Sequence, residues 1–172
     1  MSTHFEDVQE FHRKFKIHQE FGLPEFPTSG EATRKTMIEA GYPRLINHMR
    51  EVLQNLQKLN NSKPNVRILR LTLLLEEFTE YTEGEFNNNL VEVADALGDL
   101  GVIGEGTCDL YGIPYDAVRK EIHRGNMSKL DENGEPIIRG DGKILKGPNY
   151  VAPDIGSILG AQHDNWVAPT TG

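Results

Sequence analysis

Two acidic runs stand close together in the middle of the chain. The first contains Glu76, Glu77 and Glu80, and the second contains Glu92 and Asp95. Since each helical residue turns the side chain by about 100°, the acids of each run share a helix face with apolar residues, which is the face expected to point inward. Buried carboxylates are costly unless they are protonated or bind a cation. No His or Cys lies at ligand spacing within the runs, so an all-oxygen site for Mg²⁺ or Mn²⁺ is indicated.

The same acidic runs also suit a solvated helix face. Charged side chains three and four residues apart are common on exposed helices, and the chain would then be a non-catalytic helical interaction module with an acidic outer face. Two acidic runs that each share a face with apolar residues favour the metal site over this alternative.

The composition limits the classes of protein to consider. The 172 residues suit one domain, and 26 acidic against 18 basic residues give a formal charge of −8. Such a charge argues against a nucleic-acid partner. The single Cys108 cannot form an internal disulfide. The sequence shows neither the pattern of a signal peptide nor an apolar run of about 18 residues that could span a membrane. We therefore expect a soluble cytoplasmic protein.

Apolar periodicity predicts an all-α fold of about five helices within residues 1–130. They are expected at residues 4–20, 34–59 with a break near 41–43, 66–85, 90–111, and from 115 onward. The link between the third and fourth helices is short, so these two are predicted to be antiparallel neighbours with their acidic runs close together. This arrangement is the one that a shared metal site requires.

The segment after residue 130 differs in character from the helices. Residues 136–139 and 143–146 flank the turn Gly140-Asp141-Gly142 and predict a small β-hairpin. A lone hairpin is marginal in water, so residues 131–154 are expected to pack on the bundle or on a partner subunit. Residues 155–172 are predicted to be an extended tail.

Two features predict a homo-oligomer. Residues 66–75 are apolar almost all round, which is expected of a helix in the middle of a bundle with one side against another subunit. The fourth helix contains Gly98, Gly101, Gly104 and Gly106. Glycine costs about 1 kcal/mol against alanine within a helix, and close approach of another helix would account for it. A homodimer or a homotetramer is predicted.

The pattern Glu-Glu-x-x-Glu followed by Glu-x-x-Asp resembles that of the MazG-like all-α nucleoside triphosphate pyrophosphohydrolases. This family also contains dimeric dUTPases, dCTP pyrophosphatases and phosphoribosyl-ATP pyrophosphohydrolase. The segments His123–Lys129 and Asp141–Tyr150 are similar to those of phage and bacterial members. The resemblance covers roughly residues 66 to 154.

The resemblance implies an oligomeric four-helix-bundle core and a metal-dependent hydrolase. Glu77, Glu80, Glu92 and Asp95 would bind Mg²⁺, with Mn²⁺ as a substitute and with two or more ions once substrate is bound. Glu76 or Glu77 would be the catalytic group that activates water. The reaction would cleave the α–β phosphoanhydride of a nucleoside triphosphate to a monophosphate and pyrophosphate. Phosphoribosyl-ATP is the alternative substrate.

Further residues are candidates for contacts with the nucleotide. The resemblance implies Asn126 and Lys129, and the cationic segment around them adds Arg124. Phe15 and His12 could contact a base, although both also suit packing or surface roles. No motif identifies the base; dGTP to dGMP is one candidate reaction for control of nucleotide pools, in the host cytoplasm if the protein is phage-encoded.

Overall fold

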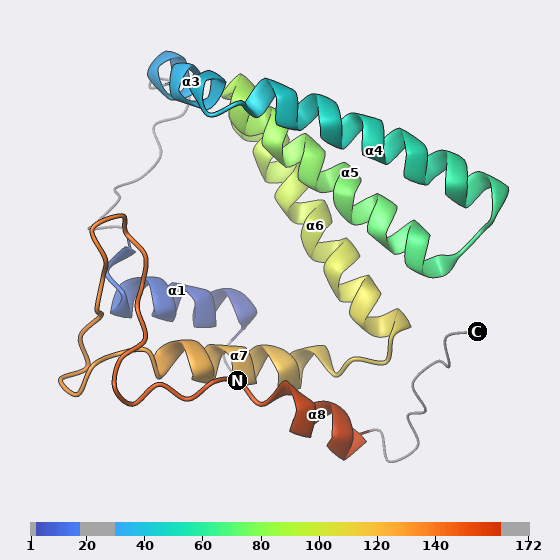
Figure 1. Ribbon diagram of the computed structural model, residues 1–172. Helices are drawn as coiled ribbons and strands as arrows, with labels where there is room; N and C mark the ends of the chain where they lie inside the picture. The colour runs from blue at the N-terminus through green and yellow to red at the C-terminus, as the bar shows by residue number, and fades with distance from the viewer. Residues whose placement is uncertain (1–2, 18–29, 163–172) are drawn as a thin grey trace. The chain divides into compact units, whose positions relative to one another are not determined.

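A computed structural model describes residues 3–17 and 30–162 (Figure 1). Within these ranges it contains seven helices and no strand. They are α1 (His4–Lys14), α3 (Gly30–Glu39), α4 (Tyr42–Ser62), α5 (Val66–Asn87), α6 (Leu90–Leu110), α7 (Tyr115–Met127) and α8 (Ile155–Gln162). The predicted all-α class is confirmed. None of the helices in the described ranges is long and apolar enough to cross a membrane.

The chain forms two compact units, each with its own contacts. The central unit comprises α3 to α6, and the terminal unit is built from both ends of the chain and contains α1, α7 and α8. In the central unit α5 packs against α4 on one side and α6 on the other, and α3 contacts α4 and α5. In the terminal unit α7 packs against α1 and α8.

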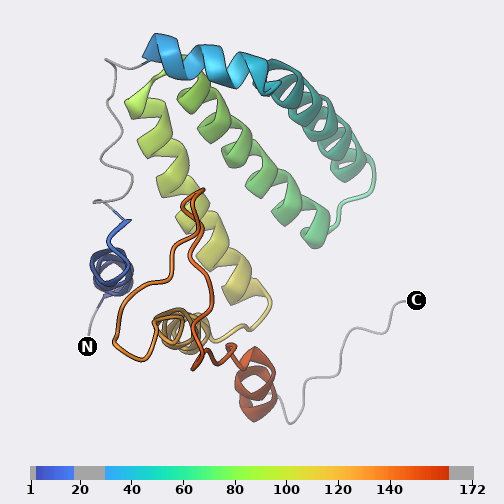
Figure 2. The same ribbon diagram turned by 60° about the vertical axis from the view of Figure 1, so that its left-hand side comes forward.

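Local signals account for the boundaries of the central helices. Asn65 caps α5, because its side-chain oxygen accepts hydrogen bonds from the backbone N–H groups of Arg67 and Ile68. Asn88 ends α5 in the left-handed conformation, with φ 55°. Only Asn88 and Asn89 separate α5 from α6, and the two helices run antiparallel (Figures 1 and 2). The predicted helical hairpin is therefore confirmed, as is the helix break at Gly41, where φ is 87°.

The buried face of α5 is made of small polar residues. Thr72, Thr79 and Thr82 are 3 to 5 % exposed, and each hydroxyl donates to the carbonyl four residues earlier. Because these hydroxyls find their acceptors inside the helix, they can be buried without an unpaired donor. Their small size allows the neighbouring helices to approach α5, and the buried Val93 and Ala96 of α6 are both apolar.

Helix α1 begins with a capping box and ends near a buried ring. The Thr3 hydroxyl accepts from the backbone of Glu6, and the Glu6 carboxylate accepts from the backbone of Thr3. Phe15 is fully buried, whereas Phe5 is 70 % exposed. The helix was predicted to reach residue 20, but α1 ends at Lys14, and residues 18–20 lie outside the described ranges.

The predicted C-terminal β-hairpin is not formed as a pair of strands. The two arms share a single antiparallel bridge, between Ile138 and Ile144. The pairing does not extend further, because the Gly147 N–H donates to the carbonyl of Lys129 at 2.9 Å rather than to the opposite arm. The turn is instead stabilised by Asp141, whose carboxylate binds the Arg139 side chain.

The predicted extended tail is helical over its first part. The Asp154 carboxylate accepts hydrogen bonds from both the backbone N–H and the hydroxyl of Ser157, which caps the first turn of α8. The sequence signal for this helix was Asp154 three residues before Ser157. Residues 163–172 lie outside the described ranges.

Candidate metal and nucleotide site

The first acidic run lies on α5. Glu76 and Glu77 are half-buried and Glu80 is exposed, one turn further along the same helix. Thr79, between them in sequence, points into the core. The three carboxylates therefore lie along the border between the buried face of α5 and its exposed surface.

Glu77 has the most unusual environment of these acids. Its Oε2 atom is buried and has no hydrogen-bond partner within the described residues. Burial raises the pKa of Glu77 above its usual value, and the charges of Glu80, Asp99, Glu76 and Asp95 raise it further. A carboxylate oxygen that is desolvated and unpaired among other negative charges is the arrangement that a bound cation would relieve.

Glu80 is subject to the same physical effects. Desolvation raises the pKa of Glu80, and the charges of Glu76, Asp95, Glu83 and Asp99 add to the increase. The acids of α5 and α6 are thus close enough to repel one another. This proximity is what the short helical hairpin was predicted to produce.

The second acidic run lies on α6, where Glu92, Asp95 and Asp99 are exposed. Glu92 faces α5 near Gly84, where an added Cβ would lie 3.2 Å from the Glu92 Cβ. Within the described residues, no three Asp, Glu, His or Cys side chains form a cluster able to hold a metal ion. Asp99 was not among the predicted ligands, yet its charge acts on both Glu77 and Glu80.

The predicted nucleotide contacts lie in the terminal unit. The ammonium group of Lys129 donates to Oδ1 of Asn126 at 2.8 Å and lies 6.0 Å from the centre of the Phe11 ring. Phe15 packs against Phe11 with ring centres 4.3 Å apart and ring planes tilted by 30°, and it has no exposed surface. The His12 ring is tilted against the same Phe11 ring.

Arg124 has structural partners in this unit. It forms a bidentate ion pair with Glu121 and also donates to the carbonyl of Ala152. Glu121 in turn accepts from the backbone N–H of Asp154, and the hydrogen bond from Arg124 is the main cause that lowers the pKa of Glu121 to about 2. These contacts hold residues 151–154 along α7.

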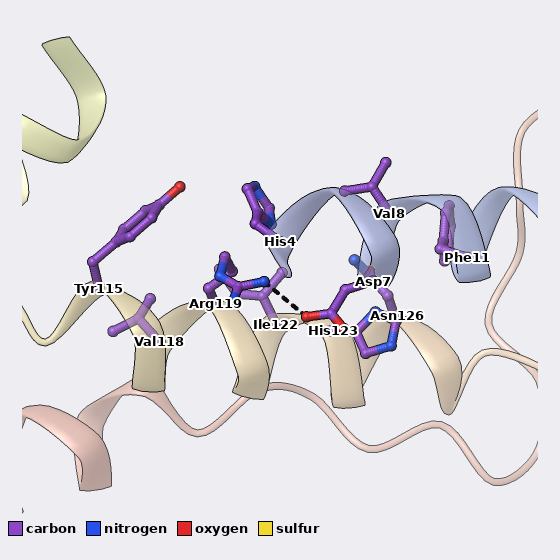
Figure 3. Close-up of a pocket in the computed structure, with 10 residues that line it drawn as sticks. All are labelled: His4, Asp7, Val8, Phe11, Tyr115, Val118, Arg119, Ile122, His123 and Asn126. Atoms are coloured by element: carbon purple, nitrogen blue, oxygen red, sulfur yellow. Dashed lines mark hydrogen bonds and ion pairs between the residues drawn. The ribbon is translucent and has the colours of Figure 1, made fainter. Parts of the chain in front are cut away.

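A cavity of about 270 Å³ lies between α1 and α7 (Figure 3). Of the five residues predicted to contact the nucleotide, Asn126 alone lines it among the described residues. The cavity also contains the ion pair between Asp7 and Arg119. Sequence reasoning missed this pair, although Asp7 stands four residues before Phe11 on the apolar stripe of α1, and a charge on an apolar stripe is a signal for a buried partner.

The geometry of the central unit defines a class: a helical hairpin with opposed acidic runs on its two helices. Residues 44–126 match the family model of phosphoribosyl-ATP pyrophosphohydrolase. The resemblance to the MazG-like all-α nucleoside triphosphate pyrophosphohydrolases is thereby confirmed for this segment.

Two further similarities extend this result. The uncharacterized protein L479 of Acanthamoeba polyphaga mimivirus is 32 % identical over 79 residues, which are 46 % of this chain and 29 % of that protein. The chain therefore spans less than a third of this relative. The crystal structure of a candidate NTP pyrophosphohydrolase from Exiguobacterium sp. 255-15 covers 94 % of this chain and 96 % of its own, with a TM-score of 0.51 and 20 % identity. That likeness establishes the fold.

Proposed function

We propose that the protein is a metal-dependent nucleoside triphosphate pyrophosphohydrolase. The observation that carries the proposal is the Glu77 carboxylate, which is partly desolvated, unpaired at Oε2 within the described residues, and surrounded by acids from α5 and α6. The substrate would be a nucleoside or deoxynucleoside triphosphate. The products would be the monophosphate and pyrophosphate.

The donor set fits a hard divalent cation. Glu77, Glu80, Glu92 and Asp95 offer only carboxylate oxygens, which Mg²⁺ and Mn²⁺ prefer. Glu80, Glu92 and Asp95 have exposed side chains, so the proposal requires them to rotate toward Glu77 when ions and substrate bind. Two or more ions are expected, since four carboxylates with one divalent cation would remain negatively charged beside a triphosphate.

The proposed reaction needs a bound metal ion, a base and side chains that contact the nucleotide. When bound, Mg²⁺ supplies charge neutralisation for the phosphate oxygens and a position for the attacking water. Glu76 or Glu77 would accept the proton of that water. Asn126 and Lys129 would contact the nucleotide, and control of nucleotide pools, with dGTP to dGMP as one candidate, is the proposed role.

Release of pyrophosphate tests this function. The purified full chain would be assayed with each common NTP and dNTP, with Mg²⁺, with Mn²⁺ and with EDTA. We expect metal-dependent turnover that falls at least about 100-fold in Glu80→Gln and Asp95→Asn. Glu105→Gln, an exposed acid on α6, is the matched control. Folded variants that retain wild-type turnover would place the site elsewhere.

Phosphoribosyl-ATP is a second candidate substrate, because the family model that matches residues 44–126 carries that name. Adding it to the same substrate panel decides between the candidates. A non-catalytic interaction module is the third hypothesis. Calorimetry with Mn²⁺ separates it from an enzyme, since a solvated acidic face would bind the ion only weakly and in a salt-sensitive way.

A homodimer or homotetramer is also proposed. Its support is the apolar surface of the hairpin within a single chain: Leu71 is 54 % exposed, Val91 is 79 % exposed and Val102 is 70 % exposed. Such apolar surface is usual at subunit contacts. Light scattering that gives the mass of a single chain would contradict this proposal.

A further inference from the structure

The cavity between α1 and α7 is lined by apolar side chains that could contact the faces of a flat ring. Val8 and Phe11 of α1 and Val118 and Ile122 of α7 line it. The side-chain rings of His4 and Tyr115 meet edge to face at its border, with centres 6.2 Å apart (Figure 3). A volume of about 270 Å³ is at the small end of ligand sites. It therefore suits a ring system with a short substituent better than a whole triphosphate.

The charges inside the cavity cancel one another. The Asp7 carboxylate and the Arg119 guanidinium are joined at 2.7 Å, and both side chains are 10 % exposed. Asp116 lies 3.7 Å from the same guanidinium. Because the guanidinium is already neutralised by carboxylates, the cavity has no excess positive charge to select an anion. The ligand that it favours is neutral.

Two polar side chains on one face of α7 have defined hydrogen-bonding roles. The Lys129 ammonium can only donate, so its bond to Asn126 identifies the accepting atom as Oδ1. The Asn126 amide nitrogen then has N–H donors left for a ligand. Glu10 accepts from Nε2 of His123 at 3.2 Å, so in the neutral ring the proton is on Nε2 and Nδ1 is an acceptor. His123 and Asn126 both line the cavity and lie one turn apart.

We propose that this cavity binds the neutral heteroaromatic ring of a nucleobase. The base combines flat apolar faces, which the walls can cover, with an edge that carries a carbonyl or ring-nitrogen acceptor beside an N–H donor. Asn126 would donate to the acceptor, in the way that amide side chains recognise base edges. The base could belong to the triphosphate substrate or to a separate nucleoside effector. The first source depends on the proposed function, and the binding itself does not.

The test is a titration of the full-length chain with deoxynucleosides that carry no phosphate, in EDTA, followed by heteronuclear NMR. Deoxyribose 5-phosphate, which lacks a base, is the ligand control. We expect saturable binding of at least one deoxynucleoside, with shifts at cavity residues, and no such binding of the control. The proposal is overturned if no deoxynucleoside binds at millimolar concentration, or if the base-less control binds equally well.

Two variants and one control variant localise the binding. Val118→Phe fills the cavity, and Val66→Phe makes the same change at a position of α5 that is 52 % exposed. Asn126→Asp removes the N–H donors but keeps an acceptor for Lys129. We expect affinity to fall about tenfold in Asn126→Asp, as loss of one hydrogen bond implies, and to fall at least as far in Val118→Phe, whose ring occupies the cavity. Affinity should be unchanged in Val66→Phe. Wild-type affinity in Asn126→Asp, with folding verified by circular dichroism, would refute the assignment even if Val118→Phe does not fold.

Kinetics distinguish the two sources of the base. If the substrate base occupies the cavity, Val118→Phe raises KM for the triphosphate and the free deoxynucleoside inhibits competitively. If an effector occupies it, KM is unchanged in Val118→Phe and the deoxynucleoside acts without competing with substrate. A chain that releases no pyrophosphate refutes the proposed function, whereas the titration alone decides whether the cavity binds a base.

Discussion

The carboxylate of Asp7 accepts a hydrogen bond from the Arg119 guanidinium across 112 positions of the chain. The pair joins α1 to α7 inside the terminal unit, where both side chains are 10 % exposed. Each member of a buried ion pair compensates the charge of the other, since either charge alone would remain desolvated without a partner.

Removing one member of this pair should destabilise the terminal unit strongly. Arg119→Leu leaves the Asp7 carboxylate buried without the guanidinium, and we expect a loss of about 3 kcal/mol in the free energy of unfolding. The double variant Asp7→Leu/Arg119→Leu should recover much of that loss, because neither charge remains. Denaturant unfolding of the three proteins measures both effects. A double variant that is less stable than Arg119→Leu would disprove the explanation.

The acids of the hairpin should make the metal-free protein less stable as pH rises. Because the folded-state pKa values of Glu77 and Glu80 are raised above the unfolded value of 4.5, their contribution is most favourable below pH 4.5 and declines as pH increases through the folded pKa. Glu77→Gln should therefore raise the melting temperature at pH 7 in EDTA and gain little near pH 4. Mn²⁺ should stabilise the wild type more than this variant. Equal melting curves for both proteins at pH 7 would contradict the expectation.

The helices of the central unit were predictable because their signals are local. Asn65, Gly41 and the asparagines after Phe86 act on neighbouring backbone groups, so their effect is visible in the sequence. The proximity of the two acidic runs followed from the short link between α5 and α6. The ion pair of Asp7 with Arg119 could not be predicted in this way, because nothing local identifies a partner 112 positions away.

The C-terminal segment was predicted less well, for a similar reason. The turn chemistry around Gly140 was recognised, but strands need a continuous ladder of backbone hydrogen bonds. The Gly147 N–H bonds to Lys129 instead, outside the segment. Tertiary contacts of this kind override a local preference for strand.

The strap formed by residues 151–154 should depend on Gly125. A Cβ at this position would lie 2.6 Å from Cγ of Pro153. Gly125→Ala should lower the free energy of unfolding by about 1 to 3 kcal/mol, as overpacking commonly does. Gly160→Ala is the control, since nothing lies within 4 Å of its added Cβ. Denaturant unfolding of both variants provides the measurement, and equal stability of the two would contradict the close contact.

Arg124 should stabilise the strap formed by residues 151–154. Arg124→Ala removes the hydrogen bond to Ala152 and the partner that lowers the pKa of Glu121 to about 2. Amide hydrogen exchange at residues 151–157 should become faster, while Mn²⁺ affinity stays unchanged. The wild type should lose this protection as pH falls toward 2, because a lowered carboxylate pKa stabilises only above it. Unchanged exchange in Arg124→Ala would show that the strap is held by other contacts.

The open glycines of α6 offer a test of oligomerisation. An added Cβ at Gly101 meets nothing within 4 Å in the single chain, so helix propensity alone predicts that Gly101→Ala stabilises by up to about 1 kcal/mol. If a second copy packs closely there, the same change should instead lower the assembly mass in light scattering. A stabilised variant that keeps its oligomeric mass would place the subunit contact on another surface.

The pairing of α1 with α7 also has a consequence for biosynthesis. At a translation rate of about 5 to 20 residues per second, the partner of Asp7, 112 positions downstream, leaves the ribosome on the order of ten seconds later. All of α3 to α6 is made during this interval, so the middle of the nascent polypeptide can become ordered while Phe11 and Phe15 are still uncovered. A chaperone that recognises exposed aromatic side chains would therefore find its target in α1 until α7 has been made.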